Sequence, residues 1–166
     1  MALWNRALAL LDRIDAPRTA HAHCDIPCGI YDPRSAQIAA QTVTTLTQKM
    51  LDLAPPGAGA SQDAQDAYDN TMTRYIVVKE EHAEKVKHEI QILWSDYFKP
   101  PHVEKYPNLH EVCWNTLKQA STCKQTVDLE GSKKLQDMVD QIATWFYETK
   151  GASDVERRVK EGRPLV

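Results

Sequence analysis

The sequence lacks several features that define other classes of protein. Its longest apolar run, from Ala7 to Leu11, ends at Asp12 and is far shorter than the roughly 20 residues of a membrane-spanning helix. Its formal net charge is only −3, with 20 basic and 23 acidic residues mixed along the chain, so there is no basic stripe for a phosphate backbone. We therefore expect a soluble protein that binds neither membranes nor nucleic acid.

Cysteine is also scarce, with four residues in 166. That number is too small for a disulfide scaffold in a chain of this length. Cys113 and Cys123 lie ten residues apart in a segment with helical periodicity, and we expect buried or free thiols there. Cys24 and Cys28 differ because they lie in a polar segment that also contains His23, where metal binding has to be weighed against a disulfide.

What the sequence does contain is helical periodicity. Apolar residues recur at steps of three and four in four segments, which predicts helices over about 32–53, 63–98, 108–123 and 132–150. Asp32-Pro33 is a typical helix start, Asn108 with Glu111 resembles a capping box, and Gly151 is placed as a stop signal. Connections between these segments are short, so the predicted fold is all-α, an antiparallel up-and-down four-helix bundle.

The two ends of the chain differ from this pattern. Residues 1–22 carry a short amphipathic stretch and end in Ala20-His21-Ala22, a small-x-small pattern that precedes cleavage sites. We predict a leader at 1–22, a helical domain at 23–151 and a charged, flexible tail at 152–166; an N-terminal helix that stays attached is the alternative. The leader is a poor secretory signal, which favours the cytoplasm and leaves periplasmic or organellar export open.

The segment from His23 to Cys28 carries the most specific chemistry. It offers one imidazole and the two thiols of Cys24 and Cys28 within six residues, a set that can reach a single transition metal. Two other interpretations remain open from spacing alone. One is a tetrahedral zinc site that adds His21, and the other is a disulfide between Cys24 and Cys28 in a turn.

Two long motifs resemble the nickel superoxide dismutases. The first is His-Cys-Asp-Ile-Pro-Cys-Gly-Ile-Tyr-Asp-Pro at 23–33, and it is similar to the metal hook of that family. The second is Leu-Trp-Ser-Asp-Tyr-Phe-Lys-Pro-Pro-His at 93–102, continued by Glu-Lys-Tyr-Pro at 104–107. The resemblance extends over about residues 23–150 and leaves the leader sequence and the tail unexplained.

The resemblance implies a ligand set, a cofactor and a reaction. The ligands would be the freed amine and imidazole of His23, the amide nitrogen and thiolate of Cys24, and the thiolate of Cys28. They would hold one nickel ion per subunit, cycling between Ni2+ and Ni3+, in an antioxidant enzyme that acts on superoxide. The resemblance also implies a homohexamer and a protease that removes the leader, because the amine of His23 is free only after cleavage.

The resemblance also implies roles for single residues around the hook. Tyr31 matches a tyrosine that borders the open face of the metal, Asp25 lies within the hook, and Tyr97 matches a second nearby tyrosine. Lys99 and Lys105 could guide the superoxide anion.

The sequence departs from the family at Ala39 and His82, where members often have a glutamate and an arginine that orient the axial imidazole. His82 either replaces them, as a residue contacting the ligand, or is a packed core histidine. A non-catalytic bundle that binds nickel or zinc is the alternative function. A helical interaction protein with an incidental thiol pair is a third, and it predicts no metal.

Overall fold

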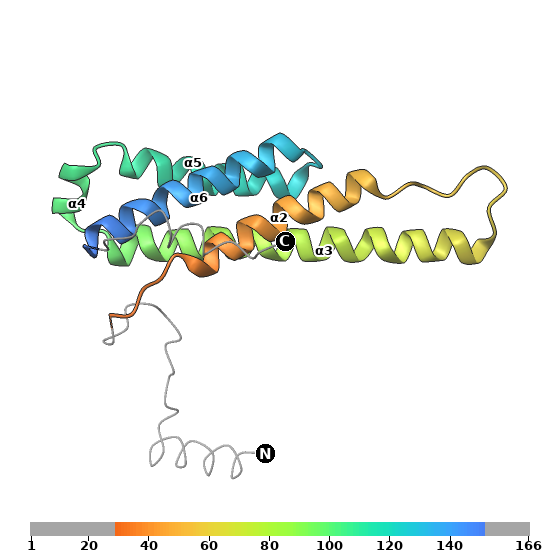
Figure 1. Ribbon diagram of the computed structural model, residues 1–166, viewed down its shortest axis with the longest axis horizontal. Helices are drawn as coiled ribbons and strands as arrows, with labels where there is room; N and C mark the ends of the chain where they lie inside the picture. Colours follow the sequence, from red (N-terminus) through yellow and green to blue (C-terminus); the bar gives the residue numbers. More distant parts are fainter. Residues whose placement is uncertain (1–28, 152–166) are drawn as a thin grey trace, which may run out of the picture.

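The computed structural model describes residues 29–151 of the chain, and all regular structure within that range is helical (Figure 1). The elements are α2 at Arg34–Asp52, α3 at Gln62–Ile92, the π-helical turn η1 at Leu93–Tyr97, α4 at Pro100–Lys105, α5 at Leu109–Gln125 and α6 at Leu129–Thr149. None of these helices is long and apolar enough to cross a membrane.

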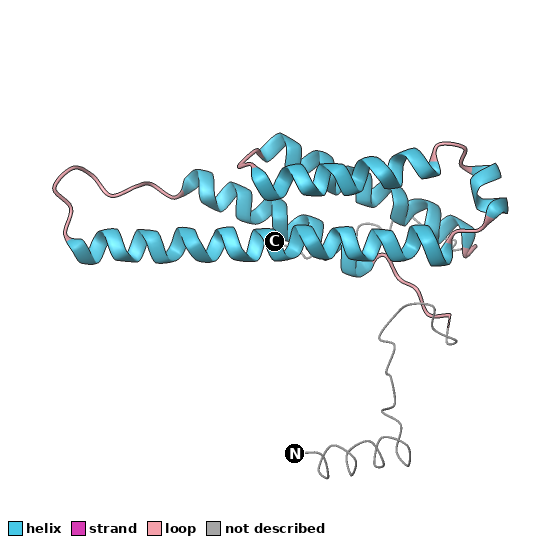
Figure 2. Cartoon of the chain, turned by 180° about the vertical axis from the view of Figure 1, so that it is seen from behind, coloured by secondary structure: helices cyan, strands magenta, loops and turns pink. Residues whose placement is uncertain are grey.

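The four long helices form a closed ring of neighbours. α2 packs against α3 and α6, and α5 packs against the same two helices from the other side. Successive helices run in opposite directions, as Figures 1 and 2 both show. The predicted antiparallel up-and-down four-helix bundle is therefore confirmed.

The core of the bundle combines small and branched side chains. Alanines on α2 and α3, including Ala39 and Ala83, are fully buried and allow those helices to approach closely. Larger fully buried side chains fill the layers between them, and each such leucine or isoleucine contributes roughly 1.5–3 kcal/mol by leaving water. These larger residues are Val86, Ile90, Leu109, Leu135, Val139 and Ile142.

The helix predicted over 63–98 ends earlier than expected. Regular α-helix stops at Ile92, and the next five residues form a π-helical turn that Phe98 closes by donating its N–H to the Leu93 carbonyl at 3.0 Å. Leu93 and Phe98 are both buried, so the wider turn keeps both on the core side before Pro100-Pro101 ends the helix. Apolar spacing alone does not distinguish such a turn from continued α-helix.

The last helix begins three residues before the predicted position. Asp128 caps α6 by accepting the Glu130 N–H at 3.1 Å, so Gly131 lies inside the helix and does not precede it. Its missing side chain matters there, because a Cβ would lie 2.6 Å from the Asp128 carboxylate and 3.2 Å from the Gln119 amide. The predicted helix at 132–150 left Gly131 outside, whereas Gly131 lies within α6 and permits close approach of α5 and α6.

Two other predictions about helix ends have different outcomes. The capping box at Asn108 does not form, because its φ of −92° and ψ of 10° depart from the extended backbone of a capping residue and its side chain makes no capping hydrogen bond. Gly151 adopts a φ of 67° beyond α6, which confirms the predicted stop. The short helix α4 was not predicted.

One lysine is buried between α3 and the end of α5. Lys79 is 2% exposed, and its Nζ donates to the carbonyls of Cys123 at 2.6 Å, Lys124 at 3.3 Å and Thr126 at 2.7 Å. Burial lowers the pKa of Lys79 from its ordinary value. The three carbonyl acceptors nevertheless match the three N–H groups of an ammonium ion, so the charged form completes the C-terminus of α5.

The first half of α3 extends beyond the rest of the bundle (Figures 1 and 2). The buried residues of α3 begin only at Lys79, although the helix starts at Gln62. Residues before that point, including Tyr75 and Ile76, are half-buried or exposed. This half of α3 therefore contributes little to the core.

Candidate active site

The predicted metal ligands precede the described part of the chain. His23, Cys24 and Cys28 all lie outside residues 29–151, as does Asp25. Gly29, the first described residue, has a φ of 63°, a left-handed conformation that glycine adopts at little cost. The backbone immediately after Cys28 thus adopts a conformation that residues with a side chain rarely take.

The segment that follows is fixed to the bundle by its polar groups. The Asp32 carboxylate accepts the Arg34 N–H at 2.8 Å and the Tyr147 hydroxyl of α6 at 3.4 Å. Pro33 is buried at the start of α2. The residues between the predicted hook and the bundle therefore have a defined position against α2 and α6.

The structure brings Tyr31 and Tyr97 together. Their ring centroids are 5.5 Å apart and the rings are tilted by 56°. Tyr31 comes from the segment before α2, whereas Tyr97 is the last residue of the π-helical turn. The two tyrosines, 66 positions apart in the sequence, thus lie side by side where the N-terminal segment joins the bundle.

Further rings surround Tyr97 and form, with Tyr31, what we call the aromatic cluster: Tyr31, Tyr97, Phe98, His102 and Phe146. The Tyr97 ring lies 4.5 Å from Phe146 and 5.6 Å from His102, measured between centroids, and it stacks on the imidazole at only 24°. Phe98 meets His102 edge-on at 5.9 Å. The π-helical turn and α4 therefore supply most of the cluster, and α6 completes it.

Positive charge lies beside these rings. The Lys150 ammonium is 5.1 Å from the Tyr97 ring centroid, within the range of a cation–π contact. Lys99 donates to the Asp96 carbonyl at 2.8 Å, and Lys105 lies 3.7 Å from the Glu148 carboxylate. Interaction with the Tyr106 phenol, and then with Glu148, raises the pKa of Lys105, so it is charged at neutral pH.

The two positions that depart from the family lie elsewhere. Ala39 is fully buried in the core, and His82 is half-buried on α3 with its Nδ1 2.8 Å from the Val78 carbonyl. His82 precedes Tyr97 by 15 residues, a separation of about 22 Å along a helix axis. Within one subunit, His82 is therefore not part of the aromatic cluster.

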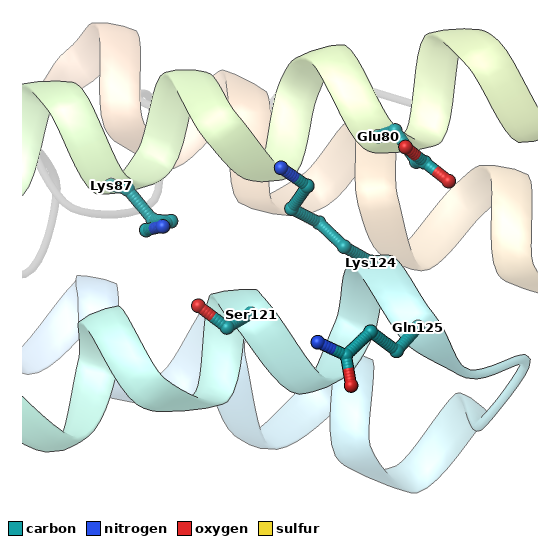
Figure 3. Close-up of a pocket in the computed structure, with 5 residues that line it drawn as sticks. All are labelled: Glu80, Lys87, Ser121, Lys124 and Gln125. Carbon is teal, nitrogen blue, oxygen red and sulfur yellow. The ribbon is translucent and has the colours of Figure 1, made fainter.

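A pocket of about 300 Å³ lies between α3 and α5 (Figure 3), and none of the residues that line it belongs to the aromatic cluster. Lys87 and Lys124 line it, but both are bound to the Glu84 carboxylate, at 3.7 Å and 2.9 Å. Hydrogen bonding to Lys124 lowers the pKa of Glu84, which keeps this carboxylate charged. The pocket thus has no strong positive field, and we do not assign the active site to it.

Sequence reasoning missed several residues around Tyr97. His102, Phe146, Thr149 and Lys150 all contact its ring or hydroxyl. His102 carried a signal, since it belongs to the second motif, whereas the other three are on α6 and become neighbours only in the folded bundle. Their position depends on how far α6 continues, which the sequence alone gives only approximately.

The donors of the N-terminal segment fit nickel. Within residues 29–151 no group of three His, Cys, Asp or Glu side chains could hold a metal ion. His23, Cys24 and Cys28 offer two soft thiolates, an imidazole and backbone nitrogens, and strong donors of this kind stabilise a higher oxidation state of nickel.

The described residues form a helical bundle, and its aromatic cluster lies where a segment with one histidine and two cysteines joins α2. These features define the class of the protein, a helical metalloprotein. Within this class, the chain belongs to the nickel-containing superoxide dismutase family, because the sequence model of that family matches residues 18–150. The chain is 43% identical over 144 residues to the superoxide dismutase [Ni] of Streptomyces coelicolor, and 40% identical over 144 residues to that of Streptomyces seoulensis. Each alignment includes 86% of this chain and 100% of the relative.

Solved structures agree with this assignment. The native nickel superoxide dismutase structure is 44% identical, has a TM-score of 0.61, and matches 77% of this chain and 99% of its own. A structure with nickel ligation after partial X-ray-induced reduction is 41% identical, has a TM-score of 0.63, and matches 78% of this chain and all of its own. The fold and the family membership are thus supported by both sequence and structure.

Proposed function

We propose that this protein is a nickel-dependent superoxide dismutase, which converts two superoxide ions and two protons to dioxygen and hydrogen peroxide. Family membership over residues 18–150, with His23, Cys24 and Cys28 all present, is the observation that carries the proposal. A non-catalytic metal-binding bundle is not favoured, because the relatives that match over their full length are named superoxide dismutases.

One nickel ion per subunit, when bound, supplies the one-electron couple that accepts an electron from one superoxide and returns it to the next. The residues of the chain have other tasks. The amine and imidazole of His23, the amide and thiolate of Cys24 and the thiolate of Cys28 would hold the ion. Pro27 lies between the two cysteines, and a proline turn there would bring the second thiolate back toward the first.

The aromatic cluster supports a role in substrate approach. Tyr31 and Tyr97 lie 5.5 Å apart at the junction of the hook and the bundle, where they would order a small molecule and its water. The Lys150 ammonium beside Tyr97 adds a local positive field that favours an anion despite the negative net charge. Protons would reach the peroxide product through water and Tyr31, and Asp25 would hold the backbone of the hook.

The leader at residues 1–22 forms part of the proposal. The small-x-small pattern Ala20-His21-Ala22 directly before His23 supports removal of this segment. A protease that cuts after Ala22 would free the amine of His23.

The proposal also includes an assembly and a compartment. The family resemblance supports a homohexamer and the poor leader signal supports the cytoplasm. His82 lies about 22 Å from Tyr97 along the helical axis of its own subunit, and in a hexamer it would instead face the hook of a neighbouring subunit. There it would orient the imidazole of His23 in place of the missing family pair at positions 39 and 82.

The test is a measurement of bound metal and superoxide removal on the processed chain from nickel-supplied cells. We expect about one nickel per subunit and dismutase activity, with loss of both in Cys24→Ser because one thiolate donor is removed. Cys113→Ala is the matched control, since that buried cysteine lies on α5 and should leave nickel and activity unchanged. A correctly cleaved, inactive chain that holds zinc would contradict the enzyme and favour the binding bundle.

A further inference from the structure

The Tyr97 hydroxyl has one partner on α6. It lies 2.6 Å from Thr149 Oγ1, and Thr149 Oγ1 lies 2.7 Å from the Phe146 carbonyl oxygen. The three oxygens form a hydrogen-bond relay from the aromatic cluster to the backbone of α6. Nothing in the sequence motifs or in the family assignment gives Thr149 a role.

The Phe146 carbonyl, at the end of this hydrogen-bond relay, determines which hydroxyl donates to which oxygen. A carbonyl oxygen can only accept, and the Thr149 hydroxyl has a single proton, so that proton is the one shared with Phe146. Thr149 therefore has only lone pairs left for its other neighbour. The Tyr97 hydroxyl must donate to Thr149, and it cannot at the same time donate elsewhere.

The ring of Tyr97 is held in the same orientation from several sides. His102 stacks on it at 24°, and the His102 Nδ1 accepts the Lys99 N–H at 3.1 Å, which fixes the imidazole. Phe146 and the Lys150 ammonium contact the Tyr97 ring from α6. Rotation of the phenol away from Thr149 would break this arrangement.

We propose that Thr149 is a positioning residue that holds Tyr97 as a hydrogen-bond donor toward α6, so that Tyr97 offers only an acceptor to the substrate side. Superoxide has no proton and cannot donate to that oxygen, whereas water and hydrogen peroxide can. Tyr97 would then contact water or product, and proton donation is left to Tyr31 and water. This inference rests on the proposed dismutase function.

The direct test is the hydrogen-bond state of the Tyr97 phenol, read by NMR from tyrosine labelled with ¹³C at Cζ in the processed chain. Tyr97→Phe identifies the signal. Thr149→Val, nearly identical in shape, should shift that signal, and Thr149→Ser should restore it. Thr144→Val is the matched control, because Thr144 makes the same kind of bond, to the Asp140 carbonyl at 2.8 Å, on the same helix. It should cause no shift.

The second readout is inhibition of the nickel-loaded enzyme by azide, a small anion with the charge of superoxide. In Thr149→Val the freed Tyr97 proton can turn toward the anion, so azide should inhibit at least roughly tenfold more tightly, the value of about one hydrogen bond to a charged group. Thr149→Ser and Thr144→Val should match the parent enzyme. A role confined to packing would leave azide binding unchanged or weaken it.

An unshifted Tyr97 signal in an active Thr149→Val enzyme would overturn this inference alone. So would a shifted signal with unchanged or weaker azide inhibition, which would make the bond a packing feature. A parent chain that is loaded with nickel but does not remove superoxide would overturn the proposed function, and with it the positioning role, whatever the Tyr97 signal shows.

Discussion

Cys113 and Cys123 illustrate how burial separates structural thiols from reactive ones. Both are free and buried, as their helical positions predicted. Burial raises the pKa of the Cys113 thiol from its ordinary value of 9.0 to about 12, and burial also raises that of Cys123 despite opposing contacts with Gln119 and Lys79. Neither thiol forms an appreciable amount of thiolate at neutral pH, so neither competes as a soft metal ligand in the folded chain.

The raised pKa of Cys113 predicts a loss of stability in alkali. A thiol whose folded pKa exceeds its unfolded pKa stabilises the fold fully below the unfolded value of 9.0, and this contribution is lost as pH rises toward about 12. We expect the free energy of unfolding to fall over this range, and to fall less steeply in Cys113→Ala. Denaturant unfolding at a series of pH values checks this; parallel curves for the two proteins would contradict it.

Individual site residues could be predicted from the sequence only where they belong to a local motif. Tyr31 and Tyr97 belong to two recognisable segments, and the fold places their rings together. Thr149 and Lys150 come from α6 and contact Tyr97 only because the bundle closes, which no sequence spacing shows. His23, Cys24 and Cys28 remain predictions from motif and donor chemistry.

At the scale of the helices, the end of α5 depends on a side chain from α3. The last carbonyls of a helix have no partner within it. Lys79 supplies donors to three carbonyls at this end and is itself almost completely buried. The contact between α3 and α5 is therefore polar at this point as well as apolar.

Lys79→Met should destabilise the fold by roughly 2–3 kcal/mol, because buried carbonyls lose a charged donor while the apolar stem is retained. Lys85→Met is the matched control: Lys85 is exposed on the same helix, and its change should stay within about 0.5 kcal/mol. The denaturant midpoint of each variant measures the effect. Equal or greater stability in Lys79→Met would mean that desolvation of the ammonium outweighs its hydrogen bonds.

Helix interiors were predicted better than helix ends for a physical reason. Apolar periodicity reports which face is buried, and it gave all four long helices. It does not report the hydrogen bonds that end a helix, so the sequence predicted α-helix over Leu93–Tyr97, where a π-helical turn forms, and predicted a last helix that starts after Gly131, which lies inside α6. Both misassigned features depend on contacts that form only between helices, at Phe98 and at Gln119.

At the scale of the whole molecule, the proposed activity depends on where the chain begins. While residue 22 is joined to His23, the nitrogen between them is an amide, which has to lose its proton before it can bind a metal, whereas a free amine offers its lone pair directly. We expect a chain that keeps its leader to bind nickel weakly and to be inactive, and the chain that starts at His23 to be active. Mass spectrometry, nickel content and superoxide removal on both forms check this.

The control for processing is a chain with one extra alanine before His23, which has a free amine at the wrong position. It should behave like the unprocessed chain. Full activity with the leader attached would exclude the amine of His23 from the ligand set, and would leave the metal to the imidazole, the amide nitrogen of Cys24 and the two thiolates.

The half of α3 that extends beyond the bundle implies unequal local stability along one continuous helix. From Gln62 to Val78 the backbone hydrogen bonds have no buried side chains to support them, and an isolated helical stretch of that length is marginal in water. In a single subunit these amides should open and exchange with solvent long before those between Lys79 and Ile92, whose opening requires disruption of the core. An assembly that covers this half of α3 would slow the exchange of the first group and leave the second nearly unchanged.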